Sequence, residues 1–197
     1  MTHFRSLALA AVAAALVAAG PARADDRYDL FNFNKLFSGA NTNAGYVGTS
    51  SPIGRQMVSI DQRYAPGTIV IRTSERRLYY VTSRGEAIRY GVGVGREGFQ
   101  WSGVKTVSAK KEWPSWTPPA QMLRRRPDLP RHMPGGIENP LGARAMYLGS
   151  SLYRIHGSNE PETIGQAVSS GCFRMTNDDV VDLYNRVRVG TTVYVLR

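Results

Sequence analysis

The chain has very few of the side chains that stabilise proteins through disulfides or metals. Of its 197 residues, one is a cysteine, Cys172, and three are histidines. A single cysteine cannot form an internal disulfide, so disulfides do not hold this fold together. The histidines and the cysteine lie far apart in the sequence and lack the close pair spacing of zinc ligands. We therefore expect no metal site.

Apolar segments long enough to cross a membrane are also missing. The run from Leu7 to Ala19 has 13 residues, whereas a helix needs about 20 apolar residues to span a bilayer. Arg5 precedes this run and the small residues "ARA" at 22–24 follow it, which is the pattern of a cleavable secretory signal peptide. We predict a signal peptide over 1–24, export to the periplasm, and no transmembrane anchor after cleavage.

Acidic side chains are scarce relative to basic ones. The 25 lysines and arginines against 15 aspartates and glutamates give a formal net charge of +10. Removal of 1–24 takes away two arginines and no acid, which lowers this charge to +8. Such a chain favours anionic partners. Export separates it from nucleic acid, and no nucleic-acid-binding motif is present, so anionic polymers of the cell envelope or lipid head groups are the expected partners.

The chain after residue 24 divides into a tether and one domain. Residues 25–65 are rich in Asn, Gly and Ser and have no sustained hydrophobic period, which predicts a flexible tether. Residues 66–197 have the length of a single domain, and short β-branched and aromatic segments separated by turn residues predict a meander of strands there. These segments are "TIVIRT", "RLYYVT", "AIRYGVGVG", "VKTVSAKKEW", the pair "RAMYLG" and "LYRIHG" as a hairpin around Ser150 and Ser151, and the final "TTVYVLR".

One segment near the C-terminus has the signals of a helix. Thr176 and Asp179 have the spacing of a capping box, and apolar residues recur at helical spacing from Val180 to Val187. Gly190 is expected to end this helix. Many strands and one main helix predict a mostly β domain with a curled, sandwich-like sheet.

Prolines are concentrated in residues 113–143, together with tryptophan and arginine. Proline removes backbone donors and disrupts helices, and long loops of this kind in compact domains are commonly functional. We predict an ordered loop without helix that acts as a lid and forms one wall of a substrate groove. Trp113 and Trp116 are the side chains expected to contact substrate from this wall.

Two familiar motifs can be set aside. Residues 93–98, "GVGREG", match the spacing of a dinucleotide-binding loop, but the following "FQWSGVKTV" is typical of a turn and a strand. The helix that would receive a pyrophosphate is therefore not expected. No G-x-S-x-G segment is present for a serine nucleophile. We expect neither a cofactor nor serine catalysis.

Cys172 and His156 remain as candidates for catalysis. A cysteine reacts as its thiolate and needs a base or a cation nearby. His156 ends the predicted strand "LYRIH", and the flexible segment between it and Cys172 could bring the two together. Gly171 leaves room for backbone N–H groups to face an oxyanion, and Arg174 supplies a cation. Taken one at a time, a buried structural cysteine, a hydrogen-bonded core histidine and a surface arginine remain alternatives.

At this point the residues resemble the YkuD type of L,D-transpeptidase catalytic domain. The resemblance rests on "YRIHG", "SSGCFRM" and "NDDVVDLYNRVRVGTTVYV" near the C-terminus, and on "GTIVIRTSERRLYYV", "AIRYGVGVG" and "NPLGARAMYLG" before them. It implies a periplasmic cysteine acyltransferase that acts on peptidoglycan stem peptides. Such an enzyme attacks the bond between meso-diaminopimelate and D-alanine, releases D-alanine through a thioester, and passes the acyl group to an amine. The acceptor can be a second stem, an outer-membrane protein or a D-amino acid.

The resemblance also implies a role for each matched residue. Cys172 would be the nucleophile, His156 its base, and the Gly157 carbonyl the group that orients the imidazole, with the oxyanion held by N–H groups near Gly171 and Cys172. Arg174, Ser169 and Ser170 would contact substrate. Ser170 is a departure, because the family pattern has histidine there.

The departure at Ser170 and the positive charge leave room for other functions. One alternative is a peptidoglycan-binding module without catalysis. Another is an L,D-carboxypeptidase that uses water as the acceptor. We expect the protein to be a monomer.

Overall fold

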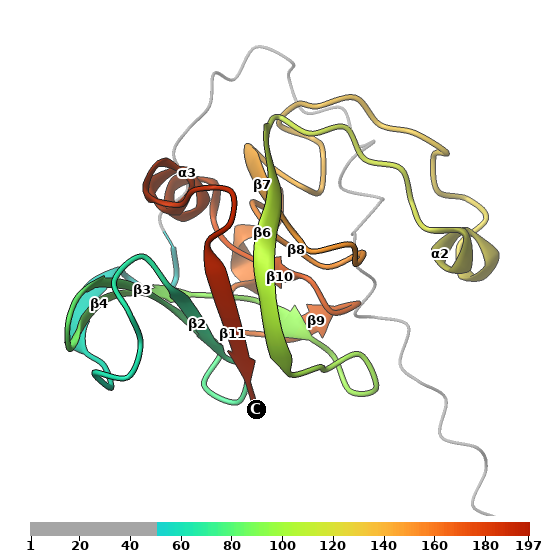
Figure 1. The fold of residues 1–197 in the computed structure, drawn as a ribbon. Helices are drawn as coiled ribbons and strands as arrows, with labels where there is room; N and C mark the ends of the chain where they lie inside the picture. The colour runs from blue at the N-terminus through green and yellow to red at the C-terminus, as the bar shows by residue number, and fades with distance from the viewer. Residues whose placement is uncertain (1–50) are drawn as a thin grey trace, which may run out of the picture.

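The computed structural model describes residues 51–197, so the predicted signal peptide and residues 25–50 of the predicted tether lie outside the described residues. The domain is mostly β, with one main helix (Figure 1). Its strands are β1 (Gln56–Ser59), β2 (Ile69–Arg72), β3 (Arg77–Ser83), β4 (Glu86–Gly91), β5 (Val94–Gly95), β6 (Gly103–Glu112), β7 (Arg144–Leu148), β8 (Arg154–His156), β9 (Ala167–Ser169), β10 (Phe173–Arg174) and β11 (Thr192–Leu196). The helices are α2 (Ala120–Arg125), the short 3-10 helix η2 (Pro161–Thr163) and α3 (Asn177–Arg186).

Nine strands form one curled sheet in the order β1-β4-β3-β2-β11-β6-β7-β8-β10, and β5 and β9 form a small second sheet. The long strand β6 joins the two halves, because its first residues pair with β11 and its later residues pair with β7. Figure 1 shows β6 crossing the middle of the molecule between these halves. The predicted meander β2-β3-β4 and the hairpin β7-β8 are both confirmed.

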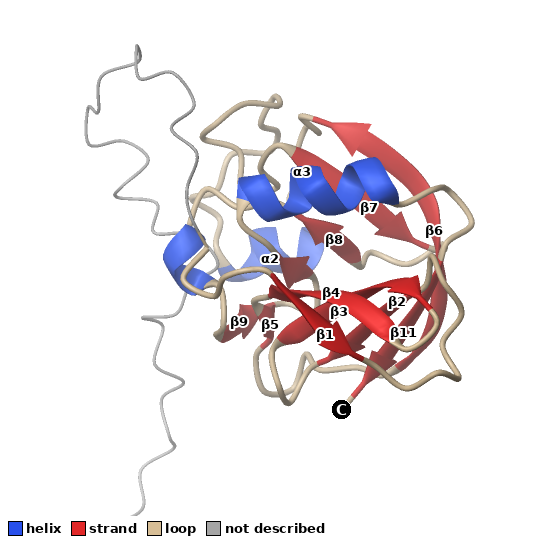
Figure 2. Cartoon of the chain, turned by 90° about the vertical axis from the view of Figure 1, so that its left-hand side faces the viewer, coloured by secondary structure: helices blue, strands red, loops and turns tan. Residues whose placement is uncertain are grey.

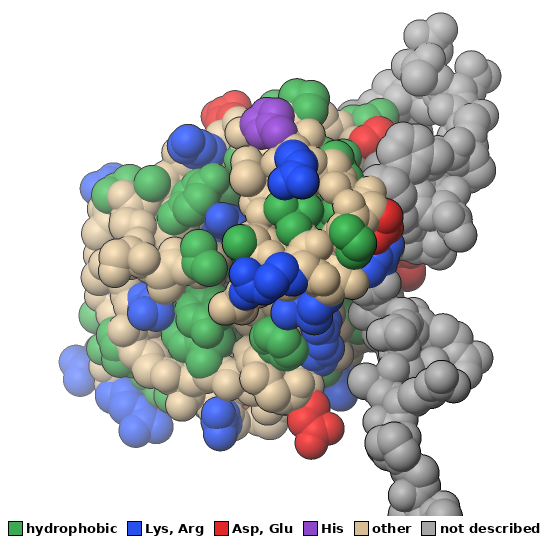
Figure 3. Space-filling model, turned by 90° about the vertical axis from the view of Figure 1, so that its right-hand side faces the viewer, with side chains coloured by type: hydrophobic (Ala, Val, Ile, Leu, Met, Phe, Trp, Pro, Cys, Tyr) green, Lys and Arg blue, Asp and Glu red, His purple; other side chains and the backbone are tan. Residues whose placement is uncertain are grey.

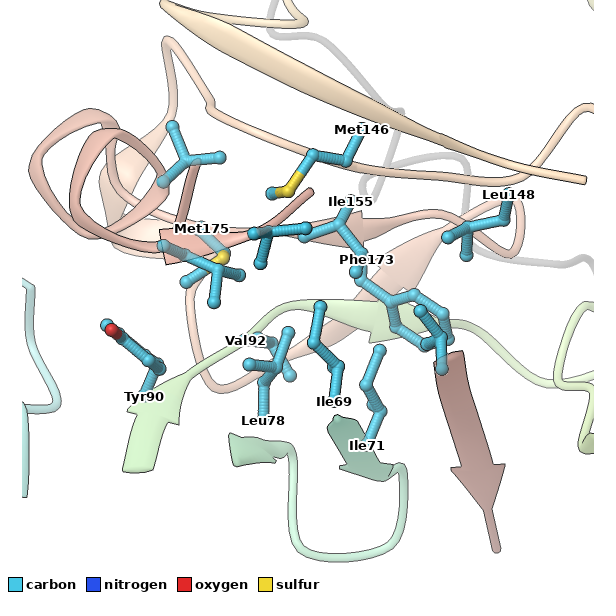
Figure 4. Close-up of a cluster of buried hydrophobic side chains, with 14 of the residues drawn as sticks. Ile69, Ile71, Leu78, Tyr90, Val92, Met146, Leu148, Ile155, Phe173 and Met175 are labelled. Atoms are coloured by element: carbon cyan, nitrogen blue, oxygen red, sulfur yellow. The ribbon is translucent and has the colours of Figure 1, made fainter. Parts of the chain in front are cut away.

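The main core lies inside the curl of the sheet. Alternate strand residues enter it, as a period of two requires, and Ile69 and Ile71 of β2 face Ile155 of β8 and Phe173 of β10 across the interior (Figure 4). Val70 points to the opposite face of β2 and joins a smaller cluster. Because β8 and β10 place these side chains in the core, the residues that alternate with them face outward.

Residues 51–65, which the sequence pattern assigned to the tether, pack against the predicted domain in the structure. β1 pairs antiparallel with β4, and Ile60 and Tyr64 are buried against the outer face of β2 and β3. Arg55 forms ion pairs with Asp179 at 3.1 Å and with Asp182 at 3.2 Å, which connects the segment to α3. The apolar residues of this stretch are too widely spaced to show a sequence period, so no signal in the sequence predicted β1.

The main helix begins where the capping signal predicts. The Thr176 hydroxyl accepts a hydrogen bond from the Asp179 N–H at 3.3 Å, and α3 lies over β7 (Figure 2). The helix ends at Arg186 instead of Gly190. Lys110 of β6 donates to the carbonyl oxygens of Tyr184 at 2.6 Å and Val187 at 2.5 Å. Its ammonium group therefore satisfies carbonyl groups at the C-terminal end of the helix.

The loop 113–143 contains a helix that the sequence did not predict. Pro119 stands at the N-terminal end of α2, where its missing N–H costs nothing, and 120–126 contain no proline. Within residues 51–197, no helix is long and apolar enough to cross a membrane.

Candidate active site

A single open pocket of about 380 Å³ contains the candidate catalytic residues. One wall comes from the loop 113–143, as predicted, and the other from β8 and the loops before β8 and β10. The residues lining it are Phe99, Trp116, Pro119, Gln121, Met122, Arg125, Pro140, Leu141, Ser151, Leu152, Tyr153, Arg154, His156, Ser170, Cys172 and Arg174. On the face of the molecule that includes α2, basic side chains lie among hydrophobic ones (Figure 3).

Strand pairing explains why His156 and Arg174 meet. β10 runs parallel to β8, with Phe173 opposite Ile155 and Arg174 opposite His156. Since side chains alternate across a strand, Ile155 and Phe173 enter the core while His156 and Arg174 share the pocket face. Arg154, two residues before His156, belongs to the same face.

His156 is buried and held in one orientation. Its Nδ1 lies 2.6 Å from the carbonyl oxygen of Gly157, and a carbonyl can only accept, so Nδ1 carries the proton and Nε2 is left as the basic nitrogen. Burial, reinforced by the positive charge of Arg174, lowers the pKa of His156 to about 3. The side chain of Asn177 packs so closely on Gly157 that a Cβ there would lie 2.3 Å from Asn177 Oδ1.

Cys172 is half-buried at the pocket floor. Its Sγ lies 3.7 Å from the carbonyl oxygen of Leu152, and the thiol is free. Burial raises the pKa of the Cys172 thiol above its ordinary value, and the positive charge of Arg154 opposes this only in part. In the free protein, Cys172 and His156 are therefore a neutral thiol and a neutral imidazole.

The backbone before Cys172 is held by Ser169. Its Oγ accepts from the Gly171 N–H at 3.1 Å and donates to the Cys172 carbonyl oxygen at 2.6 Å. Gly171 has φ +104°, and a Cβ there would lie 2.6 Å from the ring of Tyr153, so only glycine fits. The Gly171 N–H already donates to Ser169 Oγ, whereas within residues 51–197 the Cys172 N–H donates no hydrogen bond. The oxyanion donor available in this loop is the Cys172 N–H.

Trp101 also supports this loop, which the sequence did not indicate. Its Nε1 donates to the Gly171 carbonyl oxygen at 2.8 Å, although the two residues are 70 positions apart. Its ring stacks on Tyr153 with centroids 4.6 Å apart. Because the C=O and N–H of a trans peptide point in opposite directions, a fixed Gly171 carbonyl also fixes the direction of the Cys172 N–H.

Arg174 borders the pocket but its guanidinium is paired within the protein. Nη1 lies 2.9 Å from Oε2 of Glu160, and the two side chains are only 2% and 12% exposed. Thr163 Oγ1 is a further neighbour of Nη1 at 3.4 Å. The prediction of a free substrate-binding cation did not anticipate Glu160, because an acid fourteen positions away in a loop that also carries Pro161 has no recognisable spacing to Arg174.

The other predicted contact residues have different positions. Trp116 lines the pocket and is 4% exposed, packed in a cluster with Met122 and Leu141. Trp113 is 38% exposed and does not line the pocket. Ser170 lines the pocket, and within residues 51–197 its buried Oγ has no hydrogen-bond partner. Ser169 acts on the loop backbone instead of facing the pocket.

Neither a metal site nor a dinucleotide loop is formed by the described residues. Between residues 51 and 197, no three His, Cys, Asp or Glu side chains come close enough together to hold a metal ion. The glycines at 93–98 belong to β5 and a turn that leads into β6, with no helix after them.

Comparison with known proteins gives a consistent family. Residues 66–195 match the model of the YkuD family, the L,D-transpeptidase catalytic domain. The probable L,D-transpeptidase ErfK/SrfK of Escherichia coli K12 is 38% identical over 156 residues, covering 73% of this chain and 49% of that protein. The probable L,D-transpeptidase YbiS of the same organism is 38% identical over 161 residues, covering 75% and 52%. The chain thus spans about half the length of these relatives.

Solved structures agree on the fold. L,D-transpeptidase 3 from Mycobacterium tuberculosis, in complex with a faropenem-derived adduct, is 17% identical with a TM-score of 0.54, over 66% of this chain and 60% of that one. A Brucella melitensis structure, described as a probable carnitine operon oxidoreductase, is 46% identical with a TM-score of 0.51, over 72% and 92%. The family match and the identity to the curated relatives show that this chain belongs to the YkuD family of L,D-transpeptidase catalytic domains.

Proposed function

We propose that this protein is a peptidoglycan L,D-transpeptidase that works by cysteine acyl transfer. The observation that carries this proposal is the presence of Cys172 and His156 in one pocket, with His156 Nδ1 bound to the Gly157 carbonyl at 2.6 Å. This arrangement leaves Nε2 to accept the proton of the thiol. A thiol, a base and an orienting group are the components that nucleophilic catalysis requires.

The reaction proceeds through a thioester. As Sγ of Cys172 attacks the carbonyl carbon between diaminopimelate and D-alanine, its proton passes to Nε2 of His156. Collapse of the tetrahedral intermediate breaks the C–N bond, and His156 returns the proton to the departing amine of D-alanine. An acceptor amine then attacks the thioester and gives a proton to His156; collapse of the second tetrahedral intermediate breaks the C–S bond, and His156 returns the proton to the departing sulfur. Each step moves one proton through the same imidazole.

The loop around Cys172 stabilises the intermediate. The Cys172 N–H is the donor that we assign to the oxyanion, while Ser169 and Trp101 fix the peptide that carries it. Ser170, whose buried Oγ has no partner in the described part of the chain, can give substrate a hydrogen bond but cannot titrate. We assign Arg174 to holding the loop through Glu160.

Localisation and partners follow the sequence prediction. We propose cleavage after residue 24, action in the periplasm, and a monomeric enzyme. The acceptor is an amine of a second stem, of an outer-membrane protein or of a D-amino acid.

The test is incubation of residues 25–197 with a purified tetrapeptide stem, with the products identified by mass. We expect release of D-alanine and a cross-linked or exchanged product, and no release by Cys172→Ala. Release of D-alanine with a free tripeptide stem, lighter than the tetrapeptide by one alanine residue, and without cross-link would indicate a carboxypeptidase. Binding without any D-alanine release would indicate a binding module.

A further inference from the structure

Arg154 is a pocket cation that takes no part in the catalytic steps proposed above. It lies on the same face of β8 as His156, and it lines the pocket with Cys172. Its guanidinium carbon lies 5.3 Å from the ring centroid of Tyr147, which faces it across the β7-β8 pair. A ring face holds a guanidinium in place and leaves its in-plane N–H donors free for a carboxylate.

The guanidinium of Arg154 differs from the comparable buried ones. Within residues 51–197, Arg89, Arg144 and Arg154 each have a buried Nε without a hydrogen-bond partner. Arg89 donates to Gln56, Arg144 to Glu112 and the Ala143 carbonyl, and Arg174 to Glu160. In the described part of the chain, the side chain of Arg154 has no hydrogen bond or ion pair. The contact that its guanidinium makes there is a cation–π contact with the ring of Tyr147.

The rest of the pocket leaves the charge of Arg154 uncompensated. The lining contains Arg125, Arg154 and Arg174 and no aspartate or glutamate. Arg174 is neutralised by Glu160, and Arg125 is exposed on α2 with its guanidinium carbon 5.8 Å from the ring centroid of Phe99. The positive charge of Arg154 also lowers the pKa of the Cys172 thiol more than that of Arg174 does.

We propose that Arg154 is the carboxylate receptor of this pocket and positions the donor peptide for attack by Cys172. The proposal rests on the proposed function, because it takes the donor to be a stem peptide. A carboxylate is the ligand that satisfies a planar, half-buried guanidinium with free donors, through two parallel N–H···O bonds. Two carboxylates of the donor lie near the scissile bond, on the terminal D-alanine and on the diaminopimelate side chain.

Binding to the Cys172→Ala variant tests this without any need for turnover. The ligands are three synthetic tetrapeptides: the free acid, its C-terminal carboxamide, and the form with the diaminopimelate side-chain carboxylate amidated. Titration calorimetry gives the Kd of each. We expect one of the two amides to bind about tenfold more weakly than the free acid, which is the effect of losing one charge-assisted pair. The amide that loses affinity identifies the carboxylate.

The second arm adds Arg154→Gln to Cys172→Ala. Here the free acid and both amides are expected to bind within about twofold of one another, because the receptor is gone. Arg63→Gln in the same background is the matched control, since Arg63 is 69% exposed, pairs with Asp61 and carries the same charge. Arg154→Lys keeps the positive charge but loses the two parallel N–H donors of the guanidinium. It should therefore bind the free acid more weakly, with no change for the amide whose binding is weaker in Cys172→Ala.

Several results would overturn the proposal. These are equal binding of the acid and both amides by Cys172→Ala, no binding of the acid at all, or discrimination that survives Arg154→Gln. If Arg154→Gln does not fold, Arg154→Lys binding the acid as tightly as the parent would also overturn it. Failure of the parent enzyme to release D-alanine would instead contradict the proposed function, and the binding comparison remains decisive for Arg154.

Discussion

At the scale of single residues, the catalytic pair is built to stay neutral until substrate arrives. Burial raises the pKa of the Cys172 thiol and lowers that of His156. A preformed thiolate and imidazolium are therefore disfavoured in the free protein, and proton transfer accompanies attack on the carbonyl. An uncharged thiol is also less prone to oxidation, because oxidation requires the thiolate.

The neutral His156 predicts how stability depends on pH. Its pKa is about 3 in the folded protein against an ordinary value of 6.5, so the unfolded chain binds more protons between these values. The stability contributed by neutral His156 is thus complete above about pH 6.5 and is lost as pH falls towards 3. We expect His156→Gln to reduce the loss of unfolding free energy over this range, measured by urea denaturation at several pH values.

His132→Gln is the matched control for this measurement, because His132 is exposed on the lid. It should keep the pH slope of the parent. An unchanged slope in His156→Gln would show that carboxyl groups whose pKa is lowered in the folded protein, such as Asp182, dominate the acid response instead.

At the scale of elements, the segment between β8 and β10 determines where Cys172 lies. It contains η2 and β9, and the ion pair of Arg174 with Glu160 ties η2 to β10. Because this pair is almost fully buried, breaking it leaves a charge without compensation.

Glu160→Gln tests this structural role. We expect a loss of about 3 kcal/mol in the free energy of unfolding, since removal of one partner of a buried pair typically costs that much. Asp61→Asn removes an acid from the exposed pair with Arg63 and should cost less than about 1 kcal/mol. Equal small losses in the two variants would contradict a structural role for Arg174 and favour a direct one in substrate binding.

At the scale of the whole molecule, the domain needs the segment before residue 66. β1 covers the edge of β4, the side chains of Ile60 and Tyr64 close the outer cluster, and Arg55 pairs with acids of α3. We expect the chain 66–197 to be less stable than the chain 51–197 by about 3 kcal/mol or more, because two large apolar side chains lose their burial. Thermal or urea unfolding of the two proteins measures the difference.

The opposite outcome of this truncation would contradict the prediction. Equal unfolding free energies for the two chains would mean that the domain does begin at residue 66, as the sequence predicted. The Tyr64→Ala substitution in the longer chain provides a milder version of the same test.

The sequence by itself determined the parts of this protein that depend on neighbouring residues. Alternation of apolar side chains predicts β2, β3, β7 and β8, turn residues predict the hairpins, and the Thr176 hydroxyl predicts the start of α3. The same local patterns pointed to His156 and Cys172, because a histidine at a strand end and a Gly-Cys pair are visible without coordinates.

Only the tertiary structure decided which distant groups complete the site. Trp101 donates to Gly171 although the two residues are 70 positions apart, and Glu160 neutralises Arg174. Parallel pairing of β10 with β8 places Arg174 beside His156, on the face of the sheet that also carries Arg154. These relations depend on how the curled sheet brings separate segments together, which no local period encodes. Burial, which shifts the pKa of the thiol and of the imidazole, likewise exists only after the chain has folded around them.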